Sequence, residues 1–592
     1  MKQLPIVAAA VIIISIVATA VVLTLTPRAN PTFSPYPGAA IIIMENIRLN
    51  QLGYHPGSRK VAVVIDAGAE PAPSGFLIVS VPGNRIAYRG RLSGPMEWED
   101  SGERGRRADF SALAAPGRYR LILLDNDAYA GESYPFEISG GVFEGVANAS
   151  MRTFYFQRCS TPLDSRFAGK WARLAGHPDT AVSFHPSSGR QRSERPAQSP
   201  GGWYDAGDFG KYIVNSGISV GTLMAFYELF PDYFSDGSLN IPESGNGRPD
   251  ILDEVKYNLD WMKTMQDADG GVFVKLTTLE FPGYIMPEDD NWERFIIGKS
   301  TASALNFAAA MAMAGRVYMP FDGAYARDAA GRAGRAWEWA VKNPDIPFRN
   351  PEDVKTGEYR DADFGDEFIW AAAELFITTG DSRYADFLAD KDIDYQSVPT
   401  WQNVHSLAPL SLAAVENGLD ARRLDGVRGS IKAAADRWLE EMEASLYRIP
   451  NGNFIWGSNS IFANKGVGMI YAYKVSGDRK YLLGAAEIAD YLLGKNAVGM
   501  SFITAFGTNY AQNPHHRQIV AQGTGVIPGF LVGGPNKGQQ DSRHEVVYSS
   551  KLPAKSFEDV YKSYASNEVA INWNAPSTFL FAALDALMSK KY

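Results

Sequence analysis

The sequence contains a single cysteine, Cys159, in 592 residues. With one thiol the chain cannot form an intrachain disulfide, and the cysteine count neither indicates nor excludes an oxidising compartment. Zinc sites that depend on several cysteine ligands are excluded for the same reason.

An excess of positive charge is also missing. The chain carries 57 Lys and Arg residues against 66 Asp and Glu residues, which gives a formal net charge of −9. Because proteins bind the phosphates of nucleic acids through a basic face, we do not expect a nucleic-acid partner. Neutral and cationic substrates stay open.

Several signatures of catalytic chemistry are absent as well. The sequence has no His-Glu-x-x-His zinc motif, no Gly-x-Ser-x-Gly nucleophile turn and no phosphate-binding glycine loop. Aromatic residues, in contrast, are abundant at 12% of the chain. Their rings suit sugar binding, in which they stack on C–H faces, although a large core also uses aromatic side chains.

A long run of residues without a charge occurs near the N-terminus. Between Pro5 and Pro27 run the 21 residues IVAAAVIIISIVATAVVLTLT. This is longer than the ~7–15 residues of a signal-peptide core and close to the ~20 that span a bilayer. We expect residues 1–27 to be a secretion signal or a membrane anchor and residues 28–45 a proline-rich linker, which places the rest of the chain outside the cytoplasm.

The length of the chain exceeds the ~250–300 residues at which one hydrophobic core stops growing, so we expect two domains. Residues 46–139 contain apolar runs of period two at 61–65, 76–81, 118–124 and 134–138. Pro-Gly pairs lie between them. Short strands with turn signals at this spacing predict a small β-sandwich.

From residue 140 to residue 592 the pattern changes to the helical period. Amphipathic stretches recur at 216–230, 250–266, 299–318, 325–342, 366–379, 405–417, 428–446, 461–475, 480–494 and 576–589. Gly, Pro, Asp and Asn turns separate most of them. Because no sequence period and no alternating strands accompany these helices, we predict an α/α toroid rather than a repeat solenoid.

Three segments, 199–212, 506–536 and 563–576, do not fit the helical pattern and are rich in Gly, Asn, Asp, His and Trp. In the first, Asp205 and Asp208 precede a predicted helix and Lys211 follows. The helix N-terminus and the lysine favour an ionised carboxylate, as a general base requires. The alternative is that either Asp caps the helix or closes a turn.

In the last segment Glu568 lies among Val569, Ala570, Ile571 and Trp573. Apolar surroundings raise the pKa of a carboxyl group towards the range of a general acid. The alternative is a surface glutamate that starts a helix. An ionised aspartate pair that can act as a general base and a glutamate that can act as a general acid fit the hydrolysis of a glycosidic bond. Inverting enzymes hold the two carboxyl groups ~6.5–9.5 Å apart.

The middle segment contains His515, His516 and Arg517 in direct succession. These side chains are compact hydrogen-bond donors for sugar hydroxyls or for a carboxylate. They are poor metal ligands, because adjacent residues of an extended chain point in opposite directions.

Seven motifs occur in order along the chain. They are IRLNQLGY at 47–54, SPGGWYDAGD at 199–208, IPESGNGRPDILDE at 241–254, WMKTMQDADGGV at 261–272, YLLGKN at 491–496, NPHHR at 513–517 and SNEVAINWNAP at 566–576. Through nearly all of residues 46–592 the chain resembles glycoside hydrolase family 9, in the branch with an N-terminal immunoglobulin-like domain. The resemblance implies a mainly α fold, an (α/α)6 barrel with an open cleft, and hydrolysis with inversion.

The resemblance also implies roles for individual residues. Glu568 matches the general acid and Asp208 the general base, with Asp205 helping to hold the water. His515 and Arg517 match contacts to the sugar on the non-reducing side of the scissile bond. The aromatic residues expected to bind substrate are Trp203, Tyr204 and Trp573, the last in a position that is Tyr in other branches.

The resemblance bears on two metal sites, one for calcium and one for zinc. Asp366 and Glu367 resemble part of a structural calcium site, and oxygen ligands suit calcium, but a solvated helix start stays open as the alternative. Many relatives hold zinc with two cysteines and two histidines.

In this chain Cys159 and His177 match two of those zinc ligands and His185 offers a third, but Gly176 stands in place of the second cysteine. A structural zinc site normally has four protein ligands, so we predict no tightly bound zinc. The chemistry itself requires no cofactor.

We therefore expect an endo-β-1,4-glucanase of the cellulase type that acts on cellulose or a related β-glucan as a monomer. An exo-acting β-glucosaminidase or cello-oligosaccharide hydrolase of the same family is the alternative. A non-catalytic surface carbohydrate-binding protein is a further one, against which the presence of Asp205, Asp208 and Glu568 argues. Product profiles on carboxymethyl-cellulose and chitosan oligomers discriminate the two activities.

Overall fold

The computed structural model describes residues 43–66, 73–191 and 194–589. The predicted leader, residues 1–27, and nearly all of the predicted linker lie outside these ranges. Among the described residues there is no helix with the length and apolar character that crossing a membrane requires.

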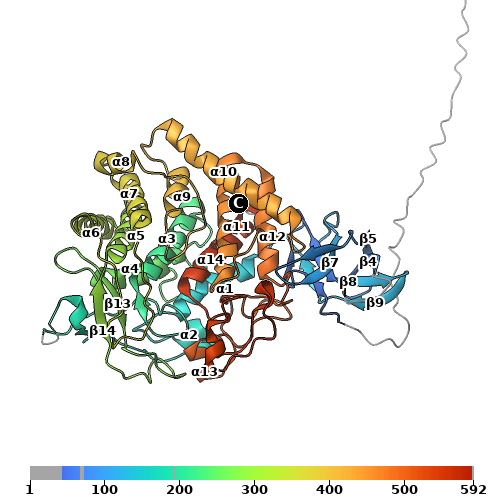
Figure 1. The fold of residues 1–592 in the computed structure, drawn as a ribbon, viewed down its shortest axis with the longest axis horizontal. Coiled ribbons are helices and arrows are strands. Elements are labelled where there is room, and N and C mark those ends of the chain that lie inside the picture. Colours follow the sequence, from blue (N-terminus) through green and yellow to red (C-terminus); the bar gives the residue numbers. More distant parts are fainter. Residues whose placement is uncertain (1–42, 67–72, 192–193, 590–592) are drawn as a thin grey trace, which may run out of the picture.

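The N-terminal part is a β-sandwich, which lies beside α12 in Figure 1. One sheet has the strand order β1 (Ile47–Arg48), β3 (Val61–Ile65), β7 (Glu103–Asp109) and β6 (Met96–Trp98). The other has the order β2 (Gly53–Tyr54), β10 (Phe136–Ile138), β8 (Gly117–Asp125), β4 (Gly75–Ser80) and β5 (Ile86–Arg91), with β9 (Ala128–Glu132) paired to β8. The four predicted strands are present, whereas strands with few apolar residues, such as β7, were not predicted.

Strand β3 is buried on both faces because the sandwich packs against the helical domain. Ala62 and Val64 belong to the core of the sandwich, whereas Val63 belongs to the core of the helical domain. Two buried faces account for the continuous apolar sequence of this strand, which a half-exposed strand would not have.

Polar contacts fix the same interface. The Arg107 guanidinium donates from Nη2 to the carbonyl oxygen of Glu443 at 2.9 Å and from Nε to that of Leu446 at 3.3 Å, where helix α10 (Ala421–Ala444) ends. Gln51 donates from Nε2 to the carbonyl oxygen of Gly499 at 3.0 Å. A cation at a helix C-terminus satisfies carbonyl groups that have no partner within the helix.

Helices form the second domain. Within the described residues, six of them contact one another in a closed order: α3 (Ile213–Leu229), α5 (Thr301–Val317), α7 (Gly365–Thr379), α9 (Leu407–Ala414), α11 (Ser458–Ser476) and α14 (Ile571–Met588), which returns to α3. All six have mostly apolar sequences, since they are covered by the protein on nearly every side.

A second set of helices packs on the outside of this ring. It comprises α4 (Asp250–Thr264), α6 (Gly323–Lys342), α8 (Ser382–Leu388), α10, α12 (Arg479–Leu492) and α1 (Glu144–Phe156), each in contact with at least one helix of the ring. The longer ones are amphipathic, for example α6, whose buried positions are mainly alanines on one face. Two shorter helices, α2 (Ser165–Ala168) and α13 (Arg517–Gln522), lie in the connections.

Each of the ten predicted helical stretches contains a helix, but the last one starts at a different residue. Helix α14 begins at Ile571, so Pro576 lies inside it rather than at its start. The predicted start of this stretch, residue 576, was therefore wrong by five residues. The sequence also gave no prediction for α1 or α8.

A small sheet beside α3 completes the fold. Its order is β11 (Ser183–Phe184), β14 (Phe295–Lys299), β13 (Phe273–Thr277) and β12 (Lys211–Tyr212). Strand β12 joins the predicted segment 199–212 directly to helix α3, and its pairing with β13 therefore fixes the end of that segment.

Candidate functional site

A cleft with a volume of about 500 Å³ lies where the segments that precede the ring helices meet. Asp205 and Asp208 precede α3, and Glu568 precedes α14. Aromatic side chains form much of the remaining wall: Tyr212, Phe281, Tyr359, Trp401, Trp456 and Trp573. The first and last of the three predicted segments thus contribute carboxyl groups to one cleft.

Two glycines shape the start of segment 199–212. Gly201 and Gly202 have φ values of 80° and 79°, which side-chain-bearing residues rarely adopt. A Cβ atom on Gly202 would lie 2.7 Å from the ring of Trp261. The close approach lets the segment turn over α4 and reach the cleft.

Asp205 is buried and is held at both carboxylate oxygens. Asn215 of α3 donates from Nδ2 to Oδ1 at 2.8 Å, and the Tyr359 hydroxyl donates to Oδ2. Burial and then the nearby Asp208 carboxylate raise the pKa of Asp205 to about 7, although both hydrogen bonds oppose this. Asp205 therefore binds a proton more readily than an ordinary aspartate.

Asp208 is 7% exposed and accepts a hydrogen bond at Oδ2 from the Gly210 amide at 3.2 Å. Neither aspartate caps α3, whose N-cap is Tyr212 without a side-chain hydrogen bond. Lys211 does not lie beside this pair as expected. Its ammonium group is 2.8 Å from Asp179 Oδ2, and the expectation about Lys211 was wrong.

Glu568 is half-buried and its backbone is held between two strand-like segments. Its carbonyl oxygen accepts from the Gly533 amide at 2.8 Å, and the chain forms an isolated bridge with His515. Burial and then repulsion by Asp208 raise the pKa of Glu568 well above its ordinary range, while Arg517 acts in the opposite direction. Glu568 therefore holds a proton under conditions in which an exposed glutamate has lost it.

The middle predicted segment contacts the first one and pairs with the chain at Glu568. Arg517 donates from its amide and from Nη1 to the Gly207 carbonyl oxygen, at 2.9 and 3.1 Å. Its Nε donates to the carbonyl oxygen of Pro282 at 2.8 Å. The guanidinium group thus binds protein carbonyls through Nε and Nη1, and its contact with a sugar stays a prediction.

His515 is 8% exposed and lies against Tyr284 and Tyr561. Its Nδ1 is 2.7 Å from the Tyr561 carbonyl oxygen, which fixes the proton on this nitrogen. Burial and then Arg517 lower the pKa of His515 to about 4, so the imidazole is neutral at neutral pH. The adjacent His516 is structural, since its Nε2 is 2.9 Å from Gln157 Oε1.

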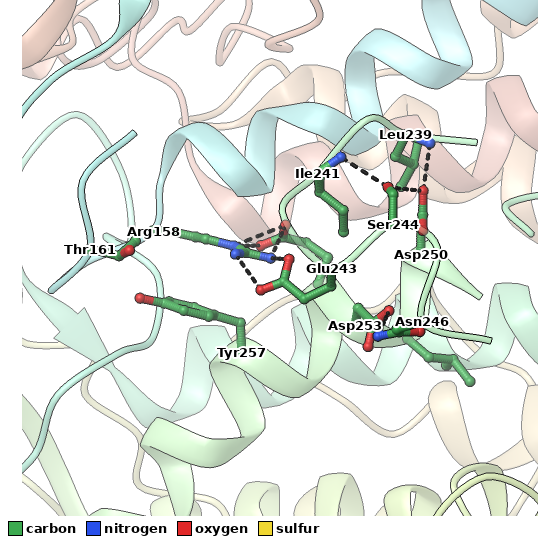
Figure 2. Close-up of polar contacts among 12 residues, drawn as sticks. Arg158, Thr161, Leu239, Ile241, Glu243, Ser244, Asn246, Asp250, Asp253 and Tyr257 are labelled. Atoms are coloured by element: carbon green, nitrogen blue, oxygen red, sulfur yellow. Dashed lines mark hydrogen bonds and ion pairs between the residues drawn. The ribbon is translucent and has the colours of Figure 1, made fainter. Parts of the chain in front are cut away.

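Trp203 and Tyr204 do not line the cleft. Trp203 is fully buried and donates from Nε1 to Glu254 Oε1 at 2.8 Å. Figure 2 shows Arg158 over the ring of Tyr257 and directed at Glu243, and Arg158 also pairs with Glu254 at 3.0 Å. Trp203 is thus an anchor to α4.

Tyr204 points into the buried interior as well. Its hydroxyl is 2.8 Å from His177 Nδ1. The two aromatic residues that precede Asp205 are therefore buried away from the cleft, and the expectation that they bind substrate was wrong. Trp573, in contrast, lines the cleft.

Sequence reasoning missed several residues of the cleft. Tyr359 was not considered, although it binds Asp205, and its φ of 47° is unusual for a non-glycine residue. Phe281, Trp401 and Trp456 were missed too. Aromatic residues in loops between predicted helices were the available signal, but sequence alone does not bring those loops together.

The predicted calcium ligands lie at the start of α7. Asp366 accepts from the Val404 amide at 2.6 Å. Glu367 is fully buried, and neither of its carboxylate oxygens has a hydrogen-bond partner among the described residues. Burial, then Asp366 and Asp361, raise the pKa of Glu367 well above its ordinary range.

The three candidate zinc ligands have protein partners instead. His177 Nε2 is 3.1 Å from Asp290 Oδ2, and His185 Nε2 is 3.2 Å from Asp353 Oδ2. Cys159 is buried, with its sulfur 3.5 Å from the carbonyl oxygen of His177. Within the described ranges no group of three His, Cys, Asp or Glu side chains has an arrangement that could hold a metal ion.

Comparisons with known proteins agree with this architecture. Residues 143–581 match the family described as Glycosyl hydrolase family 9, and residues 44–127 match the Cellulase N-terminal ig-like domain. A xyloglucan-specific endo-beta-1,4-glucanase from Bacteroides ovatus is 40% identical over 93% of this chain and 95% of its own.

Solved structures of similar proteins cover most of the chain. A Bacteroides ovatus protein titled GH9 has a TM-score of 0.84 and 37% identity, over 92% of this chain and 99% of its own. A structure titled AaCel9A in complex with cellobiose-like isofagomine has a TM-score of 0.82 and 31% identity, over 91% of this chain and 100% of its own.

Replacement of Gly207 by alanine tests the close approach of the first and middle segments. A Cβ atom at this position would lie 2.1 Å from the His515 carbonyl oxygen. Overpacking of this kind typically costs about 1–3 kcal/mol. We expect Gly207→Ala to lower the free energy of unfolding by this amount, measured by denaturant unfolding.

Gly429→Ala in the exposed middle of α10 is the matched control, because no heavy atom lies within 4 Å of its added Cβ. Alanine is favoured over glycine in a helix by about 0.8–1 kcal/mol, so this variant should be as stable as the wild type or more so. Equal stability of Gly207→Ala and Gly429→Ala would contradict the close approach of Gly207 to the His515 carbonyl oxygen.

Proposed function

The chain belongs to glycosyl hydrolase family 9, and from this premise we propose that Glu568 and Asp208 are its general acid and general base. The protein is a glycoside hydrolase of the cellulase type, an endo-acting enzyme on β-1,4-glucans. The observation that carries the assignment is that Glu568, Asp208 and Asp205 face one aromatic-walled cleft, in which Asp208 raises the pKa of both Asp205 and Glu568.

In the proposed reaction Glu568 starts protonated and Asp208 starts ionised. Glu568 gives its proton to the glycosidic oxygen as the bond from that oxygen to C1 breaks. Asp208 takes a proton from a water molecule whose oxygen bonds to C1 from the opposite face, which inverts the configuration. Asp205, fixed by Asn215 and Tyr359, helps to hold this water.

The substrate is a β-glucan polysaccharide or oligosaccharide, and the chemistry needs no cofactor. We propose that Phe281, Trp401, Trp456 and Trp573 stack on its sugar rings, which their position in the cleft supports. The relative that is 40% identical is named as specific for xyloglucan, so xyloglucan is the first polymer to compare with cellulose. We also propose that the closed ring of helices and its outer layer form the (α/α)6 barrel.

Catalytic substitutions test the assignment. We expect Glu568→Ala and Asp208→Ala to lower kcat by ~10²-fold or more without lowering the melting temperature, as removal of a general acid or base usually does. Glu416→Ala, an exposed glutamate, is the control and should keep full activity. The measurements are reducing ends and viscosity on carboxymethyl-cellulose, xyloglucan and chitosan oligomers.

The pH profile separates the two roles. Because the pKa of Glu568 is raised, activity should persist as pH rises above the ordinary range of a glutamate and fall only as Glu568 loses its proton. With a dinitrophenyl cellobioside, whose leaving group needs no proton, this alkaline loss should disappear and Glu568→Ala should regain activity. Unchanged kcat in either Ala variant would refute the assignment.

We further propose a structural calcium ion at Asp366 and Glu367, with Asp361 close enough to raise the pKa of Glu367. Support comes from Glu367, whose buried carboxylate has no partner among the described residues, and from Asp361 Oδ2, which has none either. A buried carboxylate needs a proton or a cation to neutralise it. Since the side chains alone do not form a complete site, backbone carbonyl oxygens and water would supply the remaining ligands, as calcium accepts.

Metal analysis and chelation test this site. The purified protein should contain one calcium and no zinc, and a chelator should lower its melting temperature, since an ion at 100 times its Kd stabilises by about 2.7 kcal/mol. Glu367→Gln should abolish the response, whereas Glu416→Gln should keep it. If the purified protein contains no metal and its melting temperature changes with neither calcium nor chelator, the Glu367 carboxyl group is neutralised by a proton instead. That result would refute the proposal.

We propose that the enzyme acts outside the cytoplasm as a monomer. The uncharged run between Pro5 and Pro27 and the polymeric substrate support this location. Fractionation of the native cells with N-terminal sequencing, followed by size-exclusion chromatography with light scattering, measures both points. A cytosolic protein with residues 1–27 intact would contradict the location, and a stable dimer would contradict the monomer.

A further inference from the structure

Three charged side chains form a buried cluster beneath the segment that carries Asp205 and Asp208. Asp179 Oδ1 is 2.9 Å from Arg294 Nε, and its Oδ2 is 2.8 Å from Lys211 Nζ. The side chains of Asp179, Arg294 and Lys211 are only 2%, 5% and 0% exposed. None of the three lines the cleft, and the proposed chemistry uses none of them.

The two cations bind backbone oxygens at both ends of the segment. Arg294 donates from Nη1 to the carbonyl oxygen of Phe209, the residue after Asp208, at 2.8 Å. Lys211 donates from Nζ to the carbonyl oxygens of Ser199 and Gly201, at 3.0 and 2.8 Å. The Asp179 carbonyl oxygen accepts from the Ser199 amide at 2.8 Å.

The Phe209 side chain is enclosed by the same region. Its ring centroid is 5.1 Å from that of Tyr204 and 5.3 Å from that of His177, and Phe209 is 3% exposed. The residue after Asp208 is therefore fixed through its ring and through its carbonyl oxygen. A shift of Phe209 moves the Asp208 carboxylate, because the two residues share a peptide bond.

A buried charge cluster is a costly way to stabilise a fold. Apolar side chains of similar volume often stabilise as well as a buried ion pair does, since the charges lose their hydration. Arginine, however, offers donors in a fixed planar arrangement, so one guanidinium can bind a carboxylate and a carbonyl oxygen in a defined direction. Arg294 uses its donors in this way, with Nη2 donating to Asp179 Oδ2 at 3.5 Å and Nη1 donating to the Phe209 carbonyl oxygen.

We propose that Arg294 is a positioning residue that sets the place of the Asp208 carboxylate relative to Glu568, through the Phe209 carbonyl oxygen and with Asp179 as its anchor. This inference rests on the proposed role of Asp208 as general base. A base acts only within hydrogen-bond reach of the proton it removes, and a misplacement of about 1 Å can cost ~10²-fold in rate. Arg294 touches neither substrate nor water in this role.

The test compares Arg294→Lys with Arg316→Lys. Lysine keeps the charge, but one ammonium group cannot reproduce the planar bridge between Asp179 and Phe209. Arg316 is the matched control, because its side chain is only 13% exposed and pairs with two carboxylates, Glu228 at 2.6 Å and Glu374 at 2.7 Å, away from the cleft. Both variants should have a lower melting temperature than the wild type. If Arg294 had a merely structural role, the two variants would therefore have similar kinetics.

We expect kcat to fall about 10-fold or more in Arg294→Lys, with KM changed less than about 3-fold, while Arg316→Lys keeps kcat. The loss should be equally large on the dinitrophenyl cellobioside and on an unactivated cello-oligosaccharide, because it acts on the base and not on the acid. In a Glu568 variant, by contrast, the loss should be large on the unactivated cello-oligosaccharide and small on the dinitrophenyl cellobioside. Rates are measured well below the melting temperature of each variant.

Equal kcat in the two arginine variants, a loss confined to KM, or a loss seen only with the unactivated substrate would each overturn the inference. If Arg294→Lys does not fold, Asp179→Asn removes the anchor and should give the same kinetic pattern. Inactivity of the wild type on every β-glucan would instead refute the proposed function. In that case the positioning role is tested by comparing crystal structures of the wild type and of Arg294→Lys. Unchanged positions of Phe209 and Asp208 would overturn it.

Discussion

The site depends on one constraint, which is that residues 202–212 are buried although most of them have no regular secondary structure. Buried amide and carbonyl groups need hydrogen-bond partners, and here side chains from distant parts of the chain supply them. Arg294 and Arg517 each bind a carbonyl oxygen of this segment, and Lys211, within it, binds the carbonyl oxygens of Ser199 and Gly201 just before it. The segment can therefore turn two aspartates into the cleft and still be rigid.

The same burial sets the chemistry of the carboxyl groups. Asp205 and Glu568 lie in surroundings that disfavour their charged forms, and Asp208 adds repulsion to both. Hydrogen bonds from Asn215 and Tyr359 only partly offset this for Asp205. A proton-holding glutamate opposite an aspartate pair is the division of roles that acid–base hydrolysis of a glycoside needs.

Support for this arrangement reaches far beyond the cleft. Trp203 ties the segment to α4 through Glu254, which Arg158 neutralises. The β-sandwich packs on the helical domain with β3 between two cores, and Arg107 closes the end of α10. Such contacts make the two domains one packed unit, in which the sandwich has a structural role.

The sequence by itself determined the two-domain order, the ten predicted helical stretches and the three segments that carry Asp205, Asp208, His515 and Glu568, because periodicity and composition are local properties of a chain. It gave the wrong direction for Trp203 and Tyr204 and the wrong partner for Lys211, since neighbours in sequence do not fix where a buried side chain points. Only the tertiary structure decided that Tyr359 binds Asp205 and that Arg294 binds the Phe209 carbonyl oxygen, because these partners are more than 80 positions apart in the chain and meet only when the helical domain folds.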